Sequence, residues 1–162
     1  MKQTAELKRA QAEMQPGVIT RDGLLGHDTR NLIDILEEDD AAVRRMGLTH
    51  AAIAARMQTF RKQGERGLGM DVPVAPHFSV RVDSVRGKLP CPFHHEGLYQ
   101  KVNTTVRNTR LDREVTYTDL GVHMIAEHGF YEGRGAPFRN EPMTLRDILE
   151  VPPPDPVNVG DV

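Results

Sequence analysis

The spacing of apolar residues changes near residue 72, and this change limits the folds open to the chain. Before it, in segments 32–43 and 52–60, apolar side chains recur at the three- and four-residue intervals of one helix face. From Phe78 to Val82, apolar and polar residues alternate, which is typical of a strand with one buried face. The sequence therefore predicts an α+β protein, with helices first and a small antiparallel sheet after them.

Segment 18–70 is predicted to form a helical hairpin that packs against the sheet. Asp28 or Thr29 caps its first helix and Gly47 ends it, while Thr49 caps the second. The apolar positions that would face each other across the hairpin are Leu32, Ile33, Leu36, Val43, Ala52, Ile53, Met57 and Phe60.

Segment 71–150 is predicted to hold the sheet and a helix that covers it. A loop, RGKLPCPFHHEG, follows the first strand, because this stretch contains two prolines and two glycines. The strands are expected at 78–82, 101–106 and 115–118, the last two forming a hairpin.

Two helices are predicted after the strands. Thr118 or Asp119 caps the covering helix, and Gly129 lies just past its end, where a left-handed residue is needed. Thr144 and Asp147 fit a capping box at the start of a short final helix.

The two ends of the chain are predicted to lie outside the packed part. Residues 1–17 form an N-terminal polar helix or arm, because Leu7, Ala10 and Met14 make only a thin apolar stripe. Residues 151–162 form an acidic, proline-rich tail that is expected to be disordered.

The charge balance argues against a nucleic-acid partner. The 21 basic and 23 acidic residues give a net charge of −2, whereas generic binding to phosphates needs a concentrated basic surface. No stretch approaches the roughly 20 apolar residues that span a bilayer, so no membrane partner is expected. A single cysteine agrees with a reducing compartment, so the expected location is the cytoplasm. The partners that remain are an unidentified protein or a second copy of the chain.

The only cysteine and four of the histidines are concentrated in two short segments. Cys91, His94 and His95 lie in CPFHHEG, and His123 and His128 lie in GVHMIAEHG. Thiolate and imidazole both suit a borderline-soft ion such as zinc. Three kinds of site fit these residue types: a structural zinc site, a catalytic metal site and a thiol–imidazole pair.

The order of elements from Cys91 to His128 is loop, two strands and a helix, and it resembles an enlarged ββα zinc finger. The resemblance covers these 38 residues, and the spacing from His123 to His128 matches the family best. It implies that zinc is held between Cys91 and the helix histidines. The family has a second cysteine, so here His94 or His95 would take its place. DNA binding is not carried over.

The sequence favours a small cytoplasmic binding or structural protein over an enzyme. If zinc binds at the Cys/His cluster, it substitutes for a larger core. The alternative is a metal-dependent hydrolase or nuclease that uses the same cluster with an open coordination position. Glu96 or Glu127 would then act as its general base. For the cysteine and the histidines themselves, a plain packing role is favoured over a metal site.

Overall fold

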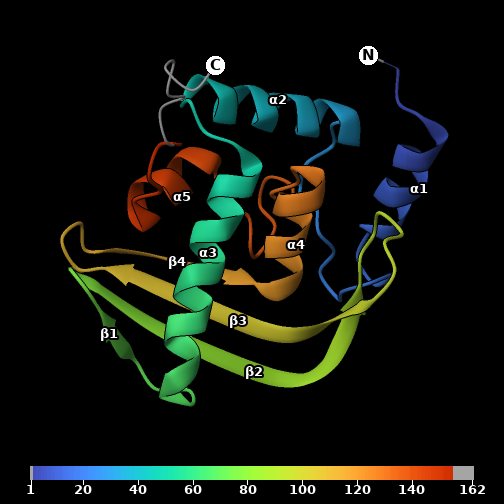
Figure 1. Ribbon diagram of the computed structural model, residues 1–162. Coiled ribbons are helices and arrows are strands. Elements are labelled where there is room, and N and C mark those ends of the chain that lie inside the picture. The colour runs from blue at the N-terminus through green and yellow to red at the C-terminus, as the bar shows by residue number, and fades with distance from the viewer. Residues whose placement is uncertain (1, 155–162) are drawn as a thin grey trace.

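The structure is a computed structural model that describes residues 2–154, and its framework is a four-stranded antiparallel sheet with helices on one face (Figure 1). The strands are adjacent in chain order: β1 (Val72–Val74), β2 (Phe78–Pro90), β3 (Leu98–Asn108) and β4 (Arg113–Thr118). The helices are α1 (Ala5–Glu13), α2 (Leu32–Arg45), α3 (His50–Gly64), the short 3₁₀ turn η1 (Glu65–Gly67), α4 (Asp119–His128) and α5 (Pro142–Leu149). The predicted α+β class is confirmed.

Alternation along the strands decides which face of the sheet is buried. Val80 pairs with Val106, and Val106 pairs with Val115, so three valines stand side by side on the covered face. All three are at least 96% buried and pack in one cluster with Phe60 of α3. The buried hydroxyl of Tyr117 donates to the Met57 carbonyl at 2.7 Å, which ties β4 to α3.

Helix α3 lies against the sheet and against α4, whereas α2 lies across the end of these two helices (Figure 1). Helices α2 and α3, which the sequence predicted to form a hairpin, therefore cross instead of running along each other. Their apolar faces serve largely different parts of the core: Ile53 and Met57 pack over the sheet, and Leu32 and Ile35 pack with α1 and α4.

Helix α4 begins and ends at the predicted residues. The Thr118 hydroxyl accepts a hydrogen bond from the Gly121 backbone N–H at 2.9 Å, as an N-cap does. Gly129 has φ +63° and follows the last helical residue, so it provides the left-handed turn that ends the helix. These local signals fix the position of a helix that carries two of the candidate ligands.

Substituting Thr118→Ala should lower the free energy of unfolding by about 1 kcal/mol, because it leaves an N–H of the first turn without its acceptor. Chemical denaturation of the two proteins measures the difference. Thr59→Ala, on the exposed part of α3, is the matched control and should change stability by less than about 0.5 kcal/mol. Equal effects of the two substitutions would contradict a capping role for Thr118.

Strand β2 extends to Pro90, so the first half of the predicted loop RGKLPCPFHHEG is strand. The ladder with β3 continues from Lys88 to Pro90 after an irregularity that contains Gly87, whose φ is +118°. Strand β1 pairs with β2 only as far as Val80. The far part of β2 is therefore an edge, where a proline is tolerated because fewer ladder hydrogen bonds are needed.

Two predicted helix starts are wrong. Helix α2 begins after Asn31, because the Asp28 carboxylate is engaged by Arg30 in an ion pair of 2.6 Å. Helix α5 begins at Pro142, whose fixed φ suits the first turn, so Thr144 lies inside the helix and forms no capping box.

The N-terminal helix α1 packs on the protein through its thin apolar stripe, so the prediction that this segment lies outside the packed part is wrong. Ala10 and Met14 are buried, and the Gln11 side chain accepts from the Leu32 N–H and donates to the Arg30 carbonyl, both at 3.0 Å. At the other end, Val151 is buried, and residues 155–162 of the predicted tail lie outside the described residues. Within the described part of the chain, no helix has the length and apolar character needed to cross a membrane.

Candidate metal centre

Cys91 and two helix histidines meet where the tip of the β2–β3 hairpin reaches α4. We call residues 91–97, which join β2 to β3, the hairpin tip. Cys91 is its first residue, His123 lies within α4, and His128 is the last residue of that helix. Helical side chains lean toward the N-terminus of their helix, so the His128 ring reaches back toward His123, with 5.5 Å between ring centroids.

The distances among the three side chains fit a shared metal ion. One ligand atom from each of Cys91, His123 and His128 lies within 4.8 Å of the other two. Cys91 Sγ is 3.6 Å from His128 Nε2. Zinc bonds of about 2.3 Å to sulfur and about 2.0 Å to nitrogen, at a tetrahedral angle, place two such atoms about 3.5 Å apart. A weak thiol–imidazole hydrogen bond has the same length, so this one distance fits both states.

One nitrogen of the His123 ring forms a hydrogen bond, and the other has no hydrogen-bond partner among the described residues. Its Nδ1 is 2.9 Å from the Tyr99 hydroxyl, and the two rings stack with 4.4 Å between centroids. Its Nε2 is buried and has no hydrogen-bond partner among the described residues. Metal-binding histidines commonly use one ring nitrogen for such an orienting bond and the other for the metal. A metal ion would therefore satisfy a buried nitrogen that no group in residues 2–154 satisfies.

Aromatic packing orients the His128 ring. Phe93 of the hairpin tip stacks on it with 4.1 Å between centroids and 13° between planes, and Phe130 packs on the edge of Phe93. Burial lowers the pKa of His128 to about 4, with further lowering by the neighbouring His95 and His123. Burial and then His95 also lower the pKa of His123. Both rings are therefore neutral near pH 7, which is the form that binds metals.

The Cys91 side chain is buried, and its surroundings do not favour a reactive thiolate. Burial raises the pKa of the thiol, although the backbone N–H groups of Phe93 and His95 oppose the rise by hydrogen bonding to the sulfur. A nucleophilic thiolate–imidazolium pair requires a lowered cysteine pKa beside a charged histidine. The opposite shifts at Cys91 and His128 argue against that chemistry. A bound cation would deprotonate the thiol, and the two N–H groups would then stabilise the thiolate.

The five predicted site residues separate into three groups. Cys91, His123 and His128 come together, as described above. His95 is exposed, but its ring lies 4.4 Å from that of His128 and 5.3 Å from that of His123 between centroids. His94 is exposed and has φ +63°, and among the described residues its ring contacts none of the other site rings.

The two orienting aromatic residues, Phe93 and Tyr99, were missed by the sequence prediction. Tyr99 was overlooked because β3 was expected to begin at Lys101, whereas it begins at Leu98. The aromatic residues on either side of the His94–His95 pair were the signal that this loop folds onto other rings.

Comparison with known proteins gives no relative to guide the interpretation. No family model matches the chain, and neither a curated protein nor a solved structure matches it. The function is therefore argued from the geometry of the centre alone.

Proposed function

We propose that the protein binds one zinc ion through Cys91, His123 and His128, and that this ion fastens the hairpin tip to α4. The observation that carries the proposal is the buried Nε2 of His123, which has no hydrogen-bond partner among the described residues and lies within 4.8 Å of the other two ligand atoms. A thiolate with imidazole nitrogens is a ligand set that zinc favours over hard ions such as magnesium.

The ion would act as a cross-link between the hairpin tip and α4, and the tip lies beyond the backbone hydrogen bonds of the sheet. The ladder between β2 and β3 ends at the pair Pro90 and Leu98, so the hairpin tip lies beyond it. Cys91 is at one side of the link, and His123 and His128 are at the other. Because such a site is not formed in the unfolded chain, the binding free energy adds to the stability of the fold. We therefore favour a non-enzymatic binding or structural protein.

A metal-dependent hydrolase is the second candidate, and the position of one carboxylate favours it. Glu127 lies on α4 between the two histidines, is exposed, and borders an open groove with His123 and another with His128. A water molecule on a three-ligand zinc would have this carboxylate nearby as a base. The coordination number separates the two candidates: four protein ligands indicate a structural ion, and three with water indicate catalysis.

Metal analysis of protein purified without added zinc tests the proposal. We expect one zinc ion per chain, and we expect a chelator to lower the melting temperature by several degrees because the cross-link is lost. His123→Ala should abolish stoichiometric binding, whereas His94→Ala, in the same hairpin tip, should retain it. A metal-free protein whose melting is unaffected by chelator and by added zinc would overturn the proposal.

A further inference from the structure

The histidine nearest to the three proposed ligands, His95, is more exposed than any of them: Cys91 is buried and His123 and His128 are half-buried. The Cys91 side chain and His123 Nε2 are buried, and the ring of His128 is covered by Phe93. In contrast, His95 is exposed, in the hairpin tip. The ring of His95 nevertheless lies against the rings of both His123 and His128.

His95 is next to the site but lies outside the group of three residues whose ligand atoms are all within 4.8 Å of one another, so its side chain must shift to complete the coordination. Structural zinc is four-coordinate, and Cys91, His123 and His128 supply three positions. His94 has a left-handed backbone, with φ +63°, and the ring of the next residue, His95, lies against the rings of His123 and His128. Of the two adjacent histidines, His95 is the one whose ring lies against two of the proposed ligands, and among the described residues the ring of His94 contacts none of the site rings.

We propose that His95 is the fourth and exchangeable ligand of the centre, and that zinc enters and leaves where His95 is displaced. This inference rests on the proposed zinc site and adds its regulation. A chelator or an acceptor thiol must reach the ion before the last protein ligands leave it. The rings of Phe93 and Tyr99 each cover one face of a ligand ring, on His128 and His123, whereas His95 is exposed. The exposed imidazole of His95 is then the ligand that an incoming group replaces first.

The rate of zinc transfer to a chromophoric chelator tests the inference, with the chelator in excess over zinc-loaded protein. His95→Ala should speed the transfer at least about ten-fold, because even second-shell substitutions cost roughly 10- to 100-fold in metal affinity. His94→Ala is the matched control and should transfer zinc within about two-fold of the unmodified rate. Because His95 is exposed, circular dichroism should show the same fold in both variants.

Cobalt substitution gives a readout that a merely structural role of His95 would not move. The thiolate-to-cobalt absorption should persist in His95→Ala, since Cys91 is retained, while the visible d–d bands should change as water replaces an imidazole. A second variant, His95→Cys, kept reduced, should slow zinc transfer because thiolate binds zinc more strongly than imidazole.

Two results would overturn the inference. If the unmodified protein binds zinc but His95→Ala matches His94→Ala in transfer rate and cobalt spectrum, the zinc site stands and the role of His95 is refuted. If the unmodified protein binds no zinc, the proposed function fails and the inference fails with it. The first measurement, the metal content of the unmodified protein, distinguishes the two cases.

Discussion

Substituting Arg139→Met should lower the free energy of unfolding by about 3–5 kcal/mol, because it leaves a buried carboxylate without its counter-charge. Arg139 Nη1 and Nη2 bind the two oxygens of Asp39 at 2.7 and 2.9 Å. The side chains are only 7% and 6% exposed. Chemical denaturation at pH 7 measures the loss.

The ion pair has a clear structural task, because it joins two parts of the chain that are 100 residues apart. Arg139 also donates to the Glu132 carbonyl at 2.8 Å, so one guanidinium holds α2 to the segment that follows α4. That segment includes Phe130, which packs against Phe93 beside the proposed ligand His128. The pair therefore supports the inner wall of the metal centre without contacting it.

A nearby exposed pair provides the matched control for this prediction. Arg134 pairs at 3.0 Å with Glu38, which lies on α2 next to Asp39, but the two side chains are 52% and 57% exposed. Arg134→Met should therefore cost no more than about 1 kcal/mol. In the double variant Asp39→Leu with Arg139→Met, most of the stability should return, since no charge is left buried. Equal losses for Arg139→Met and Arg134→Met would show that burial does not determine how much the ion pair contributes to the free energy of unfolding.

The parts of the fold that the sequence predicted correctly are those fixed by neighbouring residues. The alternation from Phe78 to Val82 lies in a strand, and α4 begins after Thr118 and ends before Gly129. In each case the signal and the structure lie within a few residues of each other. The failed helix starts had local signals too. At α2, tertiary partners replaced the predicted cap, because the Leu32 and Ile33 N–H groups donate to the side chains of Gln11 and Gln3. At α5, Pro142 begins the helix before Thr144.

The metal centre was only partly predictable for the same physical reason. The residue types indicated the chemistry, but the meeting of Cys91 with His128 depends on how far β2 extends and where the hairpin tip folds. The choice between His94 and His95 depends on the fold of the hairpin tip, which the sequence does not reveal. The long-range ion pair of Asp39 with Arg139 left no pattern in the sequence at all.

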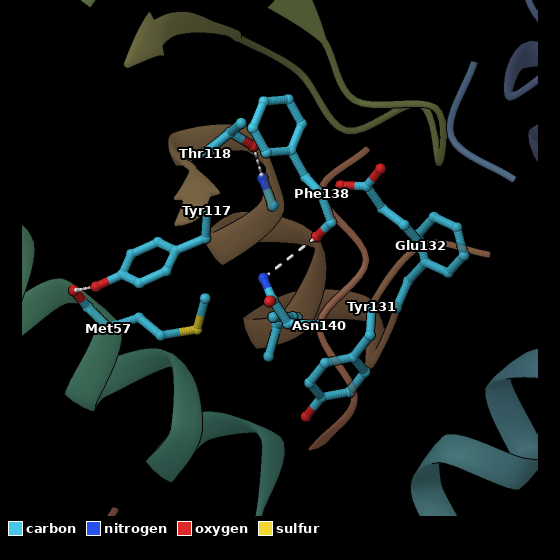
Figure 2. A pocket seen from close by; sticks show the side chains of 10 residues that line it. Met57, Tyr117, Thr118, Tyr131, Glu132, Phe138 and Asn140 are labelled. Atoms are coloured by element: carbon cyan, nitrogen blue, oxygen red, sulfur yellow. Dashed lines mark hydrogen bonds between the residues drawn. The ribbon is translucent and has the colours of Figure 1, made fainter. Parts of the chain in front are cut away.

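Substituting Glu132→Gln should remove a loss of stability that the unmodified protein shows as the pH rises from about 5 to about 8. The Glu132 carboxyl is 96% buried, and its Oε1 has no hydrogen-bond partner among the described residues. Glu132 lines a small cavity of about 10 Å³, roughly the room for one water molecule, together with Phe138 and Asn140. Figure 2 shows these lining side chains. Burial raises the pKa of Glu132 to about 8, although the Arg139 charge opposes the rise.

The sign of the pH effect follows from where the proton is bound. Below pH 4.5, the ordinary pKa of the group, folded and unfolded chains both hold the proton, and the contribution of Glu132 to stability is full. Between that pH and about 8 the unfolded chain releases the proton and the folded chain keeps it, so stability falls as the pH rises. The loss is on the order of 4 kcal/mol, because each pKa unit corresponds to about 1.36 kcal/mol.

The measurement is the difference in unfolding free energy between Glu132→Gln and the unmodified protein at several pH values from 5 to 8. The lowered pKa values of His123 and His128 affect both proteins alike, so the difference isolates Glu132. We expect the variant to gain relative stability steadily with pH, because the neutral amide releases no proton. Glu114→Gln, at an exposed position of β4, should show no such gain. A pH-independent difference for Glu132→Gln would mean that this carboxylate ionises at its ordinary pKa in the folded protein.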